Sequence, residues 1–177
     1  VMNIFYLHDD PKTCAQLHCD KHVVKMPLET TQMLCTAHHE HNHDAPYKPV
    51  HRKHPCTIWA GATRSNYAWL WKLGMALCSE YTFRYGKVHK SQYVLETLTE
   101  LPVFMIGKNI TGTSPLPQCM PDQYKVDITV EQKYEGWSAR TIRAYKNYYQ
   151  HEKARFATWK NRPIPSFMQE AVTQLAT

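Results

Sequence analysis

Six polar residues between positions 18 and 32 have the types and the spacing of a site that transfers protons. They are His18, Lys21, His22, Lys25, Glu29 and Gln32. Because they recur at steps of three and four residues, a helix would carry all of them on one stripe. Imidazoles beside a carboxylate can supply a general acid or base near neutral pH. The pattern therefore favours a proton-transfer site on a helix face, with an ordinary solvated face as the alternative.

The helix that would position this stripe is expected from about Pro11 to about His38, where apolar residues recur at helical spacing. Pro27 lies inside this segment. Because proline lacks the backbone donor and crowds the preceding turn, a bend is predicted there.

The rest of the chain also has helical patterns. Helices are expected from Thr57 to about Tyr85 with Gly86 as its stop, from about Ser91 to Leu101, from Ser138 to about Trp159, and from Ser166. A connection rich in proline and glycine is expected from 102 to about Lys125. The predicted fold is mostly α, with residues 1–177 forming a single compact domain of about three main helices with long loops.

Composition excludes several classes of protein. The 177 residues are 43% hydrophobic and 20% charged, which is unlike a disordered chain. No apolar run is long enough for a membrane helix, and Asp9 and Asp10 stand where a signal peptide would be apolar. We therefore expect no membrane contact and no secretion, and we expect the six cysteines to be free thiols.

Positive charge is concentrated at the C-terminal end. From Ser138 onward seven Lys and Arg residues face only Glu152 and Glu170, and tyrosines and a tryptophan lie between them. Cations for phosphates and rings for stacking together indicate a nucleic-acid groove. A solvated basic helix whose rings face the core is the alternative.

Metal binding is a weaker possibility. A histidine-rich loop contains His38, His39, His41 and His43, with Glu40 and Asp44 as further donors. Loops seldom hold ligands in a defined geometry, no Cys-x-x-Cys pair occurs, and we predict no metal and no cofactor. His8, Asp9 and Asp10 form a second acidic and imidazole group, and His54 lies at a helix entrance, where phosphate binds well.

Several segments together resemble a group of small phage proteins over nearly the whole chain. The segments are Asn3-Ile-Phe, Cys19-Asp-Lys-His-Val-Val-Lys25, His54-Pro-Cys-Thr-Ile-Trp59, Arg64 with Asn66-Tyr67, and Ala157-Thr-Trp-Lys-Asn-Arg162. That group is similar, more distantly, to the pyrimidine-dimer DNA glycosylases of the phage endonuclease V type.

This resemblance implies an all-helical, metal-free DNA repair enzyme. Such an enzyme cuts the glycosidic bond of a damaged pyrimidine and then breaks the strand as an AP lyase, using its N-terminal α-amine and a glutamate flanked by arginines. An ungapped match places the amine on Val1, the arginines on Lys21 and Lys25, and the glutamate on His22. Either His22 takes over the role of the glutamate, or a short gap gives that role to Glu29. If Val1 is not the native terminus, a methionine amine or a lysine would replace it.

The implied partner is double-stranded DNA that contains a damaged base or an abasic site, bound by a monomer in the cytoplasm of an infected bacterial cell. The DNA-binding residues are expected to be Lys21, Lys25, His54, Arg64, Arg140, Arg143, Lys146, Trp159, Lys160 and Arg162. The chemistry is plausible because an α-amine has a pKa of about 7.7 to 8.0 and can form a Schiff base without deep burial. The alternatives are a metal-dependent nuclease and a non-enzymatic phage DNA-binding protein.

Overall fold

The two longest helices, α2 (Asp20–Glu40) and α4 (Arg64–Tyr85), pack against each other and form the centre of the molecule. The computed structural model describes residues 2–105, 112–133 and 136–176. Helix α1 (Pro11–Leu17) packs on α4, α3 (Pro55–Ala62) packs on α2 and α4, and so does α5 (Lys90–Leu98). No strand occurs within these ranges, so the prediction of a mostly helical single domain with long loops is confirmed.

The predicted helix from Pro11 to His38 is in fact two helices, separated at His18 and Cys19. The cause is a tertiary contact. The buried guanidinium of Arg84 donates hydrogen bonds to the backbone carbonyls of Gln16 and His18, at 3.0 and 2.8 Å. Asp20 is the first residue of α2, and its backbone N–H, which has no acceptor within the helix, donates to the Thr158 carbonyl. The separation removes His18 from the stripe, whereas α2 continues through Pro27.

The predicted helix from Thr57 to Tyr85 is also two helices, separated at Thr63. Thr63 has an extended backbone, at φ −139° and ψ 158°, and its hydroxyl accepts a hydrogen bond from the backbone N–H of Asn66. The Asn66 side chain donates hydrogen bonds to the Trp59 carbonyl and the Ser114 hydroxyl, and it accepts one from the Ser114 backbone N–H. These bonds fasten the long connection to the junction between α3 and α4. At the other end of α4, Gly86 adopts φ 68° and stops the helix, as predicted.

The ends of the later helices agree only in part with the prediction. Helix α6 (Trp137–Tyr148) follows Gly136 as its cap, so Ser138 lies in the first turn, and the helix gives way to a π-helical turn at Tyr149–Lys153 well before Trp159. Helix α5 ends at Leu98 rather than Leu101, and α7 (Ser166–Ala176) starts as predicted. Short 3-10 turns lie at Val103–Met105, Asp122–Tyr124 and Glu131–Lys133.

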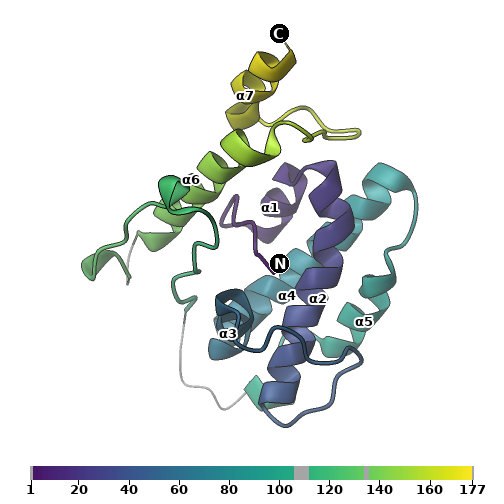
Figure 1. Ribbon diagram of the computed structural model, residues 1–177. Helices are drawn as coiled ribbons and strands as arrows, with labels where there is room; N and C mark the ends of the chain where they lie inside the picture. The colour runs from purple at the N-terminus through teal and green to yellow at the C-terminus, as the bar shows by residue number, and fades with distance from the viewer. Residues whose placement is uncertain (1, 106–111, 134–135, 177) are drawn as a thin grey trace.

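The N-terminal segment, residues 2–7, is a buried chain without regular secondary structure that runs between the helical bundle and α6 (Figure 1). Asn3 is held from both sides, because Tyr145 of α6 donates to its side chain at 2.8 Å and its own amide donates to the Cys119 carbonyl at 2.9 Å. The start of the chain is therefore placed against α6 and the long connection. No helix in the described ranges is long and apolar enough to cross a membrane.

Candidate functional site

His22, one of the two residues left open as the proton acceptor, lies in an aromatic enclosure. Its ring stacks on Phe5 at 4.1 Å between centroids, and its Nδ1 atom lies 2.5 Å from the Tyr149 hydroxyl. Burial, and then the positive charges of His18 and Lys153, lower the pKa of His22 to about 2. A buried neutral imidazole that already has a hydrogen-bond partner suits a core position better than proton transfer to a substrate.

Glu29, two turns further along α2, is in a different state. The residue is 7% exposed, and the Nζ atom of Lys25, whose side chain is largely exposed, lies 3.2 Å from its carboxylate. This pair lacks hydrogen-bond geometry, and neither carboxylate oxygen accepts a hydrogen bond from any described residue. Desolvating a charged group without hydrogen bonds costs several kcal/mol. A carboxylate kept in that state can bind or deprotonate a ligand that reaches it.

Cys56 connects Glu29 with the start of the chain. The pKa of the Cys56 thiol is raised, first by its hydrogen bond with Cys119, then by burial, and in smaller part by the negative charge of Glu29. The backbone of Ile4 acts on the same thiol in the opposite direction. Cys56 is therefore in contact with the backbone of Ile4, and it lies within the electrostatic range of the Glu29 carboxylate. Val1 itself lies outside the described residues.

A patch of cations on aromatic rings lies beside the His22 enclosure, and we call it the cation-aromatic patch. It consists of Lys21, Tyr148, Lys153, Arg155 and Phe156. Lys21 lies 4.6 Å from the centre of the Phe156 ring, and Lys153 lies 4.6 Å from that of Tyr148. Arg155 also lies over Phe156, at 5.6 Å. The two rings are half-buried against the core, and Lys21 and Arg155 beside them are exposed. Rings and cations in one patch can stack bases and contact phosphates.

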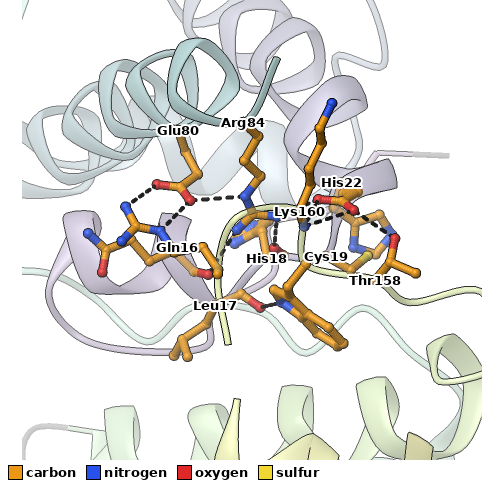
Figure 2. A network of polar contacts seen from close by, with 12 residues as sticks. Gln16, Leu17, His18, Cys19, His22, Glu80, Arg84, Thr158 and Lys160 are labelled. Atoms are coloured by element: carbon orange, nitrogen blue, oxygen red, sulfur yellow. Dashed lines mark hydrogen bonds and ion pairs between the residues drawn. The ribbon is translucent and has the colours of Figure 1, made fainter. Parts of the chain in front are cut away.

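Two residues of the predicted DNA-binding set, Arg162 and Trp159, serve the fold instead. Figure 2 shows Glu80, Arg84 and Leu17, which belong to the same polar network. Arg162 donates two hydrogen bonds to the buried carboxylate of Glu80, which also pairs with Arg84. Trp159 is buried and donates its indole N–H to the Leu17 carbonyl. These contacts fasten residues 158–162 to the bundle, and they leave little of either side chain for DNA.

The remaining predicted cations are spread over several elements. Arg64 begins α4, Arg140, Arg143 and Lys146 lie on α6, and Lys160 lies over the Tyr85 ring at 5.1 Å. Lys146 lies over the Phe167 ring of α7 at 5.0 Å. Two other residues of the predicted DNA-binding set lie near the candidate site: Lys25 lies beside Glu29, and Lys21 belongs to the cation-aromatic patch. The structure brings His54 to the N-terminus of α3, where the imidazole accepts a hydrogen bond from the Cys56 amide.

The histidine-rich loop does not form a cluster of metal-binding geometry. His38 and His39 lie in the last turn of α2 and not in a loop, where His38 forms a hydrogen bond with the Tyr67 hydroxyl and His39 with the Tyr47 carbonyl. His8 accepts a hydrogen bond from the Asp10 amide, and Asp10 caps α1. Among the described residues, the one group of three His, Cys, Asp or Glu side chains close enough to share an ion is His54, Cys56 and Cys119.

Sequence reasoning missed this group and the Phe156 ring of the patch, whereas Tyr148 was among the tyrosines expected to stack. His54 and Cys56 are adjacent enough in sequence to be noticed, but Cys119 lies 63 residues after Cys56 and carries no local signal. Phe156 and Lys153 were visible only as part of a general basic segment. No protein family, curated protein or solved structure matches the chain.

Proposed function

We propose that the protein is a DNA glycosylase with AP lyase activity on damaged pyrimidines, acting through a Schiff base from its N-terminal amine. The observation that carries the proposal is the buried carboxylate of Glu29, which no hydrogen bond satisfies and which acts electrostatically on Cys56, a neighbour of Ile4 in the N-terminal segment. The phage glycosylase resemblance requires a carboxylate and a terminal amine in one site. Glu29 supplies the first where the ungapped match offered only His22.

The proposed reaction uses few groups. The neutral amine attacks C1′ of the damaged nucleotide, the bond between C1′ and the base breaks, and the base leaves with a proton. The sugar ring opens to an imine, whose carbon-nitrogen double bond makes the C2′ proton acidic. Glu29 takes that proton, the C3′–O bond breaks, and water then releases the amine from the strand end.

Lys25 and the cation-aromatic patch support the binding half of the proposal. Lys25 is largely exposed beside Glu29, so it can pair with a phosphate next to the reacting sugar. The rings of Tyr148 and Phe156 offer stacking surfaces once a lesion is unstacked, a step that costs a few kcal/mol and least for a poorly paired base. The partner would be double-stranded DNA with a damaged base or an abasic site, bound by a monomer in the cytoplasm of an infected bacterium.

The test is a borohydride trap in excess EDTA. The protein is incubated with a duplex that carries an abasic site or a thymine dimer, and borohydride reduces any imine to a stable amine. We expect a covalent protein–DNA adduct that maps to the N-terminal residue. Absence of an adduct on both duplexes, with the DNA still bound, would overturn the enzyme and leave a non-enzymatic DNA-binding protein. Strand cleavage that occurs only with added metal would instead indicate a nuclease.

A further inference from the structure

Three soft donor side chains from two distant segments meet beside the N-terminus of α3. His54 is the cap of that helix, Cys56 lies in its first turn, and Cys119 lies on the long connection that leads to α6. One ligand atom from each lies within 4.8 Å of the others, and the two sulfur atoms are 3.5 Å apart. Both cysteines are free thiols.

We propose that His54, Cys56 and Cys119 form a zinc site with one open coordination position. Two thiolates and one imidazole are a donor set that Zn²⁺ prefers, and a zinc with three protein ligands keeps its fourth place for water or another ligand. Zinc binding would release two thiol protons, leaving both sulfur atoms as thiolates. The site lies beside the proposed reaction centre but is independent of it.

The sulfur separation fits a shared zinc better than a disulfide. Two thiolates at about 2.3 Å from a tetrahedral zinc lie roughly 3.8 Å apart, so the observed pair must widen by only a few tenths of an ångström. A disulfide would need the same atoms at about 2.05 Å. The existing spacing is therefore nearly that of the metal-bound state.

The backbone around the ligands is already fixed. The Cys119 amide donates to the Tyr145 hydroxyl at 3.1 Å, and the Cys119 carbonyl accepts from Asn3 at 2.9 Å. His54 and Cys56 are held in the cap and first turn of α3. Because both sides of the site are held before any metal arrives, little conformational entropy is lost on binding.

The imidazole offers one unprotonated nitrogen to a metal. The Nδ1 atom of His54 accepts a hydrogen bond from the Cys56 backbone N–H at 3.1 Å, so Nδ1 carries a lone pair and the ring proton lies on Nε2. Zinc bound through Nδ1 would displace the Cys56 N–H from this lone pair, and Nε2 would keep the ring proton. Metal binding would therefore exchange one helix-capping hydrogen bond for a bond to zinc.

Cobalt titration tests the site directly. The whole chain, without a histidine tag, is stripped with chelator under reducing conditions and titrated with Co²⁺ in the absence of oxygen. We expect one equivalent to produce the visible bands of tetrahedral cobalt together with a near-ultraviolet thiolate-to-cobalt band, and zinc to abolish both. Absence of a thiolate band would overturn the proposal, because binding by the histidine-rich loop alone produces no such band.

Two variants and their matched controls assign the ligands. Cys119→Ser and His54→Asn should each weaken cobalt binding at least tenfold, with folding checked by circular dichroism. His89→Asn is the matched control, because His89 caps α5 through the same Nδ1-to-amide hydrogen bond as His54 caps α3. Cys78→Ala is the control for loss of a thiol. Equal binding by Cys119→Ser and wild type would overturn the site, whereas retention of imine trapping in EDTA would show that the lyase does not depend on it.

Discussion

The two ends of one polar stripe on α2 differ in how completely their groups are paired. At the start of the helix, His22 has a ring on its face and a hydroxyl on its Nδ1 atom, and Asp20 pairs with Arg84. Two turns later, Glu29 has one lysine and no hydrogen bond. From residue type alone, His22 and Glu29 were equally good candidates for the proton acceptor. The difference teaches that a buried polar group without hydrogen bonds, rather than the presence of an imidazole, separates a candidate site from a core contact.

The sharpest test of this comparison is Glu29→Gln, which keeps the shape of the side chain and removes its charge. If Glu29 is the proton acceptor, we expect strand cleavage at an abasic site to fall by about 10²- to 10⁴-fold. Stability should stay equal or rise, since a buried charge without hydrogen bonds is removed. Single-turnover cleavage and urea unfolding measure the two effects. Glu40→Gln, at the exposed end of the same helix, is the control, and equal activity of the two variants would contradict the assignment.

The paired end of the stripe should respond in stability. Arg84 is fully buried and binds Glu80, Asp20 and two backbone carbonyls, so Arg84→Met leaves buried acceptors without their donor. We expect a loss of about 3–5 kcal/mol in the free energy of unfolding. Urea denaturation measures it, and Arg155→Met, at an exposed position, should change stability by less than about 0.5 kcal/mol. A loss of similar size in both variants would show that the network contributes nothing specific.

Acid should destabilise the protein through its buried histidines. Burial lowers the pKa of His18 to about 4 and that of His22 to about 2, from the ordinary 6.5. The unfolded chain therefore binds protons below pH 6.5 that the folded chain does not bind. Stability is unaffected by these groups above pH 6.5 and falls as the pH drops below it, by about 1.4 kcal/mol per pH unit for each such histidine.

The variant His22→Leu separates this effect from other acid effects. It should cost about 1–3 kcal/mol at pH 7.5, because the Tyr149 hydroxyl loses a partner, and it should flatten the pH dependence by one proton. Unfolding curves between pH 7.5 and 4.5 measure both changes. Abasic-site cleavage should be retained. Loss of cleavage in a folded His22→Leu protein would return His22 to the candidate site and reverse the comparison.

The smallest expected effect is on DNA affinity. Lys21→Ala and Lys153→Ala each remove one cation from the cation-aromatic patch, so each should weaken binding a few-fold and reduce the salt dependence by about one phosphate contact. Fluorescence anisotropy at several salt concentrations measures both. Lys48→Ala, on the connection between α2 and α3, is the control. An unchanged salt slope in both patch variants would place the DNA elsewhere.

Local patterns in the chain were sufficient for the helical class and for several boundaries. Gly86 ends α4 because glycine adopts the left-handed backbone freely, and α7 begins at Ser166, the residue expected from the sequence. The break at His18 was not predictable, because it depends on Arg84, which contacts that turn from another helix. The break at Thr63 has a local signal that was overlooked, because the Thr63 hydroxyl caps α4 at the backbone N–H of Asn66, three residues later. The two candidate proton acceptors were both visible in the sequence, but their surroundings were not.

The sequence by itself determined a mostly helical chain with a polar stripe on its first long helix and a basic, aromatic C-terminal part, since helical period and residue type are local properties. Only the tertiary structure decided which of these side chains are buried and paired within the fold and which are left without a hydrogen-bond partner. It enclosed His22, left Glu29 without hydrogen bonds, used Trp159 and Arg162 in the fold, and brought Cys119 to Cys56. The reason is physical: burial and pairing depend on residues that are far away in the chain, and no spacing rule encodes them.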